Sequence, residues 1–427
     1  MNIHIAGGRV IDPASGLDAE QDLYIAESKV VAIGSSPKGF RADRRIKAEG
    51  LIVCPGLVDI AARLREPGFE YRATLASEAM AAVAGGVTSL ACPPDTDPPL
   101  DEPGLVEMLK RRAGSLNLVH VYPVGALTQG LQGRMLSEMS QLAEAGCVAF
   151  SQGNAPLPDP QMLLRTLQYA ATMNYPVWLR PQEPSLAAGG VAHDGEVATR
   201  LGLPAIPTVA ETIAVSTILF LVRETGARVH LCRLSSADAV ELVRRAKADG
   251  LPVSCDLSIN HLHLTDVDIG DFDSNCKLNP PLRSRRDLEA LRAGLADGTV
   301  DIICSDHTPV DDDEKQLPFG EAAAGASGLE LLLPLTLKWA TQAGVPMAKA
   351  LAPLTWVPAD LLGVAAGRLE PGAIADVCIF DPARSWQVDA ARLRSQGHNT
   401  PFAGHRLDQA VCYTLVGGHI VHEPRST

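Results

Sequence analysis

Residue types that could bind a metal or attack a substrate are scattered in this chain. His261 and His263 form a His-x-His pair. Residues i and i+2 of a strand point to one face, so such a pair could hold a metal. We favour packing in a loop or core for this pair, and we do not expect His307, next to Asp306, to act in catalysis. No Cys-x-x-Cys spacing suggests a zinc site.

Composition and charge restrict the class of protein. The 427 residues suit one large α/β barrel and a second module, and the hydrophobic fraction of 46% is typical of a soluble globular protein. The net charge of −13 argues against nucleic-acid binding, because phosphate contacts need a basic surface. We see no signal peptide and no apolar run long enough for a membrane span. Nine dispersed cysteines favour buried thiols in a reducing compartment, so a cytoplasmic location is expected.

The middle of the chain alternates between strand-like and helical segments. Stretches 74–84 and 237–248 have the spacing of amphipathic helices. Alternation over about 300 residues favours a parallel sheet closed into a (β/α)₈ barrel over residues 53–365. Both ends carry short β patterns, so residues 1–52 and 366–427 are expected to form one small β-sandwich domain. The strand-like runs are 88–92, 118–124, 148–150, 176–179, 228–231, 252–255 and 300–304.

Segment 55–68 reads PGLVDIAARLREPG and resembles the first barrel strand of the amidohydrolase superfamily, in its dihydroorotase branch. The family motif has His-x-His where this chain has Ala61 and Arg63. The resemblance covers nearly the whole chain and implies an amidohydrolase-type (β/α)₈ barrel. Its other motifs lie at 125–128, 150–151, 195–196, 200–204, 277–283, 306–309, 328–330 and 399–402.

The resemblance implies a metal site whose ligands have been lost. Active relatives bind two zinc ions, and metal-bound hydroxide attacks the ring amide of the substrate. The last-strand Asp survives as Asp306, and one carboxylate does not hold a zinc pair. We therefore expect no catalytic residue, no metal and no cofactor. The degenerate positions are Ala61, Arg63, Gln152, Gly153, Arg180 and Arg233.

The substrate side of the motif has changed as well. Arg65 and Asn279 match family positions that hold the substrate carboxylate and ring. The matching loop Asn is Asp95, whose carboxylate would repel an acidic pyrimidine precursor. Val310 replaces the second His of the family's Asp-His-Ala-Pro-His. Recognition and chemistry are thus both expected to fail.

Arginines at the former histidine positions predict a replacement of charge. An Arg within a barrel is most often a structural ion-pair partner. Here guanidinium groups would take over from the dications and satisfy the carboxylates of Asp59 and Asp306. A buried carboxylate left alone would be costly.

By resemblance, the chain looks like the non-catalytic subunit of bacterial aspartate carbamoyltransferase, which would hold the catalytic chains in a larger complex of pyrimidine biosynthesis. Self-association as a dimer is expected too. Two alternatives remain open. Arg63, Arg65, Arg180 and Arg233 could form an anion-binding module for a metabolite. The chain could also be a hydrolase with a rebuilt site that uses one metal at Asp306.

Overall fold

Eight parallel strands form the wall of a barrel. The computed structural model describes residues 1–424, and these strands are hydrogen-bonded in the order β15-β14-β13-β10-β9-β8-β7-β6. Arg63 N donates to the carbonyl oxygen of His307 at 2.9 Å, just beyond the first and last strands. The sheet is therefore nearly closed, and the predicted amidohydrolase-type barrel is confirmed. The strands are β6 (Leu57–Asp59), β7 (Val87–Cys92), β8 (His120–Ala126), β9 (Ala149–Ser151), β10 (Val177–Leu179), β13 (Val229–Leu231), β14 (Val253–Ser258) and β15 (Ile302–Cys304).

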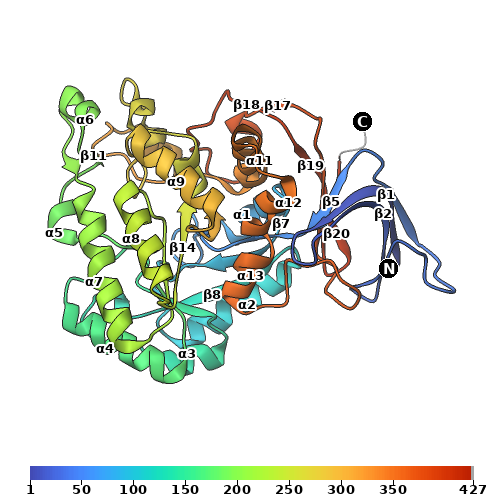
Figure 1. Ribbon diagram of the computed structural model, residues 1–427, viewed down its shortest axis with the longest axis horizontal. Helices are drawn as coiled ribbons and strands as arrows, with labels where there is room; N and C mark the ends of the chain where they lie inside the picture. The colour runs from blue at the N-terminus through green and yellow to red at the C-terminus, as the bar shows by residue number, and fades with distance from the viewer. Residues whose placement is uncertain (425–427) are drawn as a thin grey trace.

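Helices cover the outside of this wall (Figure 1). Thr74 caps α1 with a reciprocal capping box, and the Ser236 side chain caps α8, so both predicted helices are confirmed. Glycines in the left-handed conformation end several of the others, as Gly226 ends α7. The main helices are α1 (Leu75–Ala84), α2 (Pro103–Leu116), α3 (Met139–Ala145), α4 (Pro160–Met173), α7 (Val209–Thr225), α8 (Ala237–Ala248), α9 (Arg285–Asp297), α11 (Leu332–Ala343) and α13 (Trp356–Leu362).

Short elements decorate the connections between the barrel strands. The connection between β10 and α7 contains two short helices and a pair of two-residue parallel strands, and another short helix follows β15. The short helices and strands are α5 (Pro184–Ala187), α6 (Glu196–Leu201), α10 (Asp312–Lys315), α12 (Met347–Leu351), β11 (Ala192–His193), β12 (Ala205–Ile206), β17 (Trp386–Gln387) and β18 (Arg406–Leu407).

The two ends of the chain share a second sheet, on the right in Figure 1, where both termini lie. Its order is β20-β19-β16-β5-β1-β2-β3, with β4 pairing β1. Lys29 bridges to Ile374, so β3 approaches the segment before β16 and the sheet curls around its own apolar core. The strands are β1 (Ile3–Asp12), β2 (Leu17–Ala26), β3 (Lys29–Ile33), β4 (Arg44–Lys47), β5 (Ile52–Pro55), β16 (Val377–Asp381), β19 (Ala410–Val416) and β20 (His419–His422).

All nine cysteines are unpaired, and eight of them are buried. Burial raises the pKa of the Cys92 and Cys147 thiols to about 12, so these groups pack as neutral apolar side chains. Within residues 1–424, none of the helices has the length and hydropathy that a bilayer crossing requires.

Candidate functional site

The carboxyl ends of the barrel strands carry a cluster of arginines. Arg63 follows β6, Arg180 follows β10, and Arg233 follows β13, while Asp306 follows β15. Parallel strands end at one edge of a barrel, which is where barrel enzymes place their chemistry. The cluster therefore occupies the position at which a catalytic site would be expected.

Asp306 is the centre of a buried ion-pair network. Its Oδ1 accepts a hydrogen bond from Arg233 Nη1 at 2.9 Å and lies 3.7 Å from Arg63 Nη1. The three side chains are only 5–7% exposed. Arg233 Nη2 donates to Asn154 Oδ1 at 2.8 Å, and Arg63 Nη1 donates to Thr308 Oγ1 at 3.0 Å. Both guanidinium groups are held in place around one carboxylate, as the predicted charge replacement requires.

Asp95 is a second acidic partner in this network. Arg63 Nε donates to Asp95 Oδ2 at 2.9 Å. Burial disfavours the Asp95 carboxylate, but the positive charges of Arg63, Arg65 and Arg233 outweigh it and lower the pKa of this group. Asp95 stays ionised, so it neutralises the charge that Arg63 brings to the site.

Three residues around the site adopt the left-handed backbone conformation, which is uncommon for residues other than glycine. They are Arg65 (φ 65°), Arg233 (φ 55°) and Asp306 (φ 48°). Asp256 Oδ1 accepts a hydrogen bond from the Arg233 backbone N–H at 2.9 Å and so holds one of these turns. Such backbone strain is concentrated at binding and catalytic sites. The backbone is therefore strained at three residues around this cluster.

Arg180 and Arg65 make no ion pair among the described residues. Arg180 Nη1 donates to Gln182 Oε1 and, at 2.7 Å, to Asn279 Oδ1. Burial, followed by the charges of Arg233 and Arg63, lowers the pKa of Arg180 to about 9. Arg65 Nε donates to the carbonyl oxygen of Pro309 at 2.9 Å, and burial with the neighbouring Arg63 lowers its pKa to about 10. These two guanidinium groups are stabilised by neutral partners.

Gln152 and Gly153 lie at the former carboxylate position and have different surroundings. Gln152 Nε2 donates to Thr128 Oγ1 and to the carbonyl oxygen of Leu131, both at 2.9 Å, and none of its hydrogen bonds reaches an arginine of the cluster. Gly153 has φ +61°, and a Cβ there would lie 3.2 Å from Asp95 Cβ. The Asp95 side chain thus fills the space beside Gly153.

The two remaining positions named from the motif, Ala61 and Val310, have buried apolar side chains. Ala61 lines a cavity of about 30 Å³ together with Arg63 and Arg233. The Val310 side chain is buried, and its backbone N–H donates to Asn399 Oδ1 at 3.0 Å. Neither residue offers a polar side-chain atom to a ligand.

The prediction that a guanidinium satisfies Asp59 is wrong. Asp59 Oδ1 accepts from the Ser305 backbone N–H at 2.9 Å, and its Oδ2 accepts from the Ser305 hydroxyl. Burial raises the pKa of Asp59 above its usual range. Asp59 therefore ties β6 to the end of β15 through neutral donors, and within residues 1–424 it makes no ion pair with an arginine.

The three histidines singled out from the sequence make separate structural contacts. His261 Nε2 donates to the carbonyl oxygen of Pro281 at 3.1 Å, and His263 Nε2 donates to that of Leu335 at 2.9 Å. Burial lowers the pKa of both, to about 3 for His263, so they are neutral. His307 accepts from the Gly328 N–H at Nδ1, and its Nε2 contacts Glu78 Oε2 at 2.6 Å. None of these rings converges on another.

A polar network on β13 and β14, inside the barrel, was not predicted from the sequence. His230 Nε2 lies 2.9 Å from Asp256 Oδ2, and His230 Nδ1 lies 2.8 Å from Ser254 Oγ. The potential ligand atoms of His230, Cys232 and Asp256 all lie within 4.8 Å of one another. His230 and Cys232 lie two residues apart at β13, and the parallel pairing of β13 with β14 brings Asp256 next to them.

The two zinc ions implied by the resemblance do not fit the residues present at the barrel mouth. Guanidinium groups carry no lone pair for a metal and repel a dication. Arg233 Nη1 already occupies the Asp306 carboxylate at 2.9 Å. The chemistry of the donor set is therefore that of an ion-pair network.

Comparisons with known proteins agree with this architecture. The family described as Dihydro-orotase-like matches residues 50–239, and the Amidohydrolase family matches residues 194–421. A dihydroorotase-like protein of Pseudomonas aeruginosa is 45% identical over 423 residues, which is 99% of this chain and 100% of that protein. A protein of Geobacter sp. (strain M21) named dihydroorotase is 41% identical over 426 residues, with 99% of this chain and 100% of that protein covered.

Solved structures show the same fold. The L-hydantoinase (dihydropyrimidinase) of Arthrobacter aurescens superimposes with a TM-score of 0.88 at 25% identity, over 99% of this chain and 96% of that one. A D-hydantoinase gives 0.83 at 20% identity, over 99% and 95%. Barrel and site position define the amidohydrolase class. The chain belongs to the amidohydrolase family, among its dihydroorotase-like proteins.

Proposed function

We propose that this chain is a catalytically silent dihydroorotase homologue that acts as a structural subunit of aspartate carbamoyltransferase in pyrimidine biosynthesis. The observation that carries the proposal is the Arg63–Asp306–Arg233 network, which takes the place of a metal centre. A barrel maintained along its full length around such a network is maintained for something other than hydrolysis.

The chemistry of the network supports the first half of the proposal. Hydrolysis of a cyclic amide needs an activated water and a general base. Asp306 and Asp95 are each bound to a guanidinium, at 2.9 Å in both cases, and this holds them as ion-pair partners. Arg63 and Arg233 are charged donors and cannot accept a proton.

The outer surface of α7 offers one candidate contact area for a partner. Val209, Ile213 and Phe220 are 44%, 43% and 68% exposed, and their spacing places them along one side of the helix. Exposed apolar side chains in a row are typical of protein contacts. A stable interface would bury at least about 1,000 Å² in total. A dimer of this chain is the expected form of the scaffold.

Co-expression with the aspartate carbamoyltransferase chain tests the second half. We expect the two proteins to co-purify and the transferase to show a larger mass with this chain than without it, by analytical ultracentrifugation. Phe220→Asp is expected to weaken assembly, while Val267→Asp, at a position 64% exposed on another surface, serves as the matched control. The scaffold proposal fails if the transferase has the same mass and the same rate in both samples and the proteins elute separately.

Metal content and turnover test the silent site directly. We expect no stoichiometric zinc after dialysis and no dihydroorotate hydrolysis with added zinc. One or two zinc ions per chain by elemental analysis, or hydrolysis that disappears in Asp306→Ala, would overturn the proposal.

A hydrolase with a rebuilt site is the second candidate. The cluster of His230, Cys232 and Asp256 favours it, as does the name of the 41% identical Geobacter protein. Against it, Asp256 already binds His230 at 2.9 Å and the Arg233 N–H at 2.9 Å. Zinc that is lost in His230→Gln and kept in Asp306→Ala would assign the metal to this cluster.

A further inference from the structure

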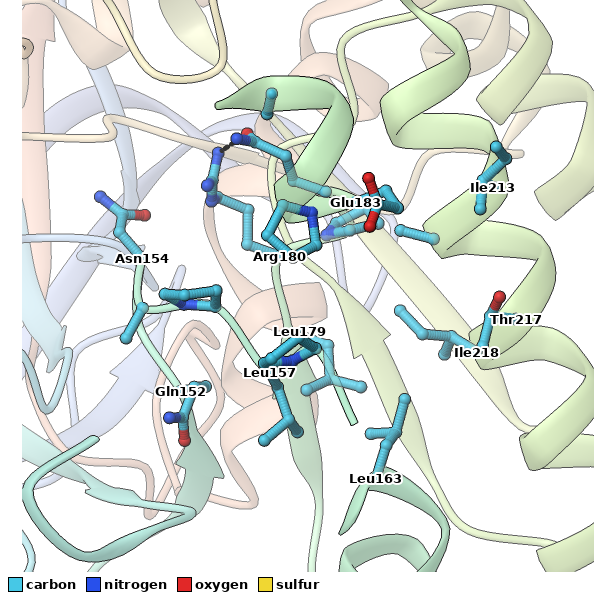
Figure 2. A pocket seen from close by; sticks show the side chains of 18 of the residues that line it. Gln152, Asn154, Leu157, Leu163, Leu179, Arg180, Glu183, Ile213, Thr217 and Ile218 are labelled. Atoms are coloured by element: carbon cyan, nitrogen blue, oxygen red, sulfur yellow. Dashed lines mark hydrogen bonds between the residues drawn. The ribbon is translucent and has the colours of Figure 1, made fainter. Parts of the chain in front are cut away.

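A pocket of about 470 Å³ opens beside the barrel mouth, between the segments that follow β9 and β10 and the helices α4 and α7 (Figure 2). This volume lies in the range of small-molecule sites. The pocket has a polar end and an apolar end. Arg180 and Asn154 lie at the first, and Leu163 and Ile218 lie at the second.

Arg180 gives the polar end its charge. Both hydrogen bonds of its guanidinium leave from Nη1, toward Gln182 and Asn279. Its Nε and Nη2 have no hydrogen-bond partner among the described residues, and no carboxylate there lies within ion-pair distance. An arginine that is largely buried without a counter-ion is unfavourable, and a carboxylate ligand would complete it with two parallel hydrogen bonds.

The rest of the lining selects a ligand with an apolar body. Four apolar side chains face the same space from α4, β10, α7 and the loop after β9; they are Leu163, Leu179, Ile218 and Leu157. Glu183 is the one acidic residue among the described residues of the lining, and its carboxylate accepts the Leu186 N–H at 2.6 Å to cap α5. One free guanidinium near one carboxylate favours a ligand with a single negative charge over a dianion.

We propose that this pocket binds a small monocarboxylate with an apolar body, the carboxylate on Arg180 and the body against Leu163 and Ile218. The pocket includes the degenerate metal-site positions Gln152, Gly153 and Arg180, but it extends away from the substrate position of the motif, because Arg65 and Asp95 are not part of its lining. Ile213 of the α7 row also lines this pocket, so binding is tested on the chain alone, where it does not depend on the scaffold role.

Isothermal titration calorimetry on the full chain tests the proposal with three probes that share a phenyl group. These are 3-phenylpropanoate, 3-phenylpropan-1-ol and phenyl phosphate. We expect the carboxylate to bind with a Kd of about 1 mM or lower, and the alcohol to bind at least about tenfold more weakly. Phenyl phosphate, a dianion, is expected to bind more weakly than the carboxylate.

Variants at the two ends of the pocket separate charge from volume. Arg180→Met is expected to weaken 3-phenylpropanoate binding at least about tenfold, because a charge-assisted hydrogen bond is lost. Thr217→Phe, on the α7 side of the lining, fills the space and should weaken the carboxylate and the alcohol alike. Arg223→Met is the control, because it removes one positive charge at an exposed position of α7 that does not line the pocket. This variant should bind 3-phenylpropanoate like the parent.

Three results would overturn the proposal. The first is equal binding of the carboxylate and the alcohol. The second is unchanged binding in Arg180→Met or, should that variant fail to fold, in Thr217→Phe. The third is no heat from any probe, or tighter binding of phenyl phosphate than of the carboxylate.

Discussion

The two halves of the arginine cluster solve the same problem differently. Arg63 and Arg233 form ion pairs with Asp95 and Asp306, although Arg63 Nη2 and Arg233 Nε are buried without a hydrogen-bond partner among the described residues. Arg180, on the β10 side, is held by Gln182 and Asn279, which are neutral. The pKa of Arg180 falls to about 9 because burial and the charges of Arg233 and Arg63 outweigh the opposing effect of the more distant acids.

The difference teaches that replacing histidine by arginine has two separate outcomes. Where a carboxylate lies within ion-pair distance, as Asp95 does for Arg63 and Asp306 for Arg233, the arginine becomes part of a structural ion-pair network. Arg180 has no carboxylate within ion-pair distance among the described residues, and it lies at the end of a pocket with Nε and Nη2 free of hydrogen-bond partners there. A stability measurement distinguishes the first outcome and a binding measurement the second.

The same substitution in both halves gives the largest expected contrast. Arg233→Met leaves Asp306 buried with Arg63 at 3.7 Å, so we expect a loss of about 3–5 kcal/mol in the free energy of unfolding. Arg180→Met removes a charge that has no acidic partner and should change stability by less than about 1 kcal/mol. Urea unfolding of the two variants compares them, and similar losses in both would abolish the distinction between the halves.

A substitution at Gly153 tests how tightly the side chains pack around Asp95, in the half of the cluster that is ion-paired. Gly153→Ala places a side chain at φ +61° and brings its Cβ to 3.2 Å from Asp95 Cβ. The conformation alone costs about 1–2 kcal/mol for a non-glycine residue. Gly226→Ala, at φ +67° with nothing within 4 Å, is the matched control for that cost. A larger loss at Gly153 than at Gly226 measures the Asp95 contact, and equal losses would show that the contact relaxes freely.

Asp95 gives the smallest effect, and it depends on pH. Its folded-state pKa is lowered by Arg63 against the effect of burial, so ionised Asp95 stabilises the fold above the unfolded pKa of about 4 and loses this contribution as pH falls through the folded pKa. At pH 7 we expect Asp95→Asn to be about 1 kcal/mol less stable than the parent. The difference should shrink between pH 5 and pH 3 in urea unfolding, and a difference that stays constant would contradict the ion pair.

The barrel could be predicted from the sequence because strand and helix patterns repeat along it. The helix at 237–248 was placed to the residue, since Ser236 caps its start and its apolar positions recur at helical spacing. The excursion from α5 to β12 was not predicted. Its two strands have two residues each, and so short a run has no recognisable periodicity.

The residues that form the candidate site could be predicted from the sequence, but their interaction partners could be predicted only in part. Asp306 was expected to pair with arginine, and it does. Asp59 was expected to do the same, and its actual partner, Ser305, depends on how β6 meets the end of β15. The pairing of Asp95 with Arg63 and the pocket at Arg180 depend on loops brought together by the tertiary fold, for which the sequence has no local signal.

The sheet formed by both ends of the chain determines the order in which the two domains can be completed during synthesis. Strand β5, near the start of the chain, lies between β1 and β16, and β16 is made only near the end. The barrel strands can leave the ribosome and pair while one edge of β5 still lacks its neighbour. The domain that opens the sequence is thus the last to be completed. A truncation that removes β16 and β19 would leave an open strand edge that invites association between nascent chains.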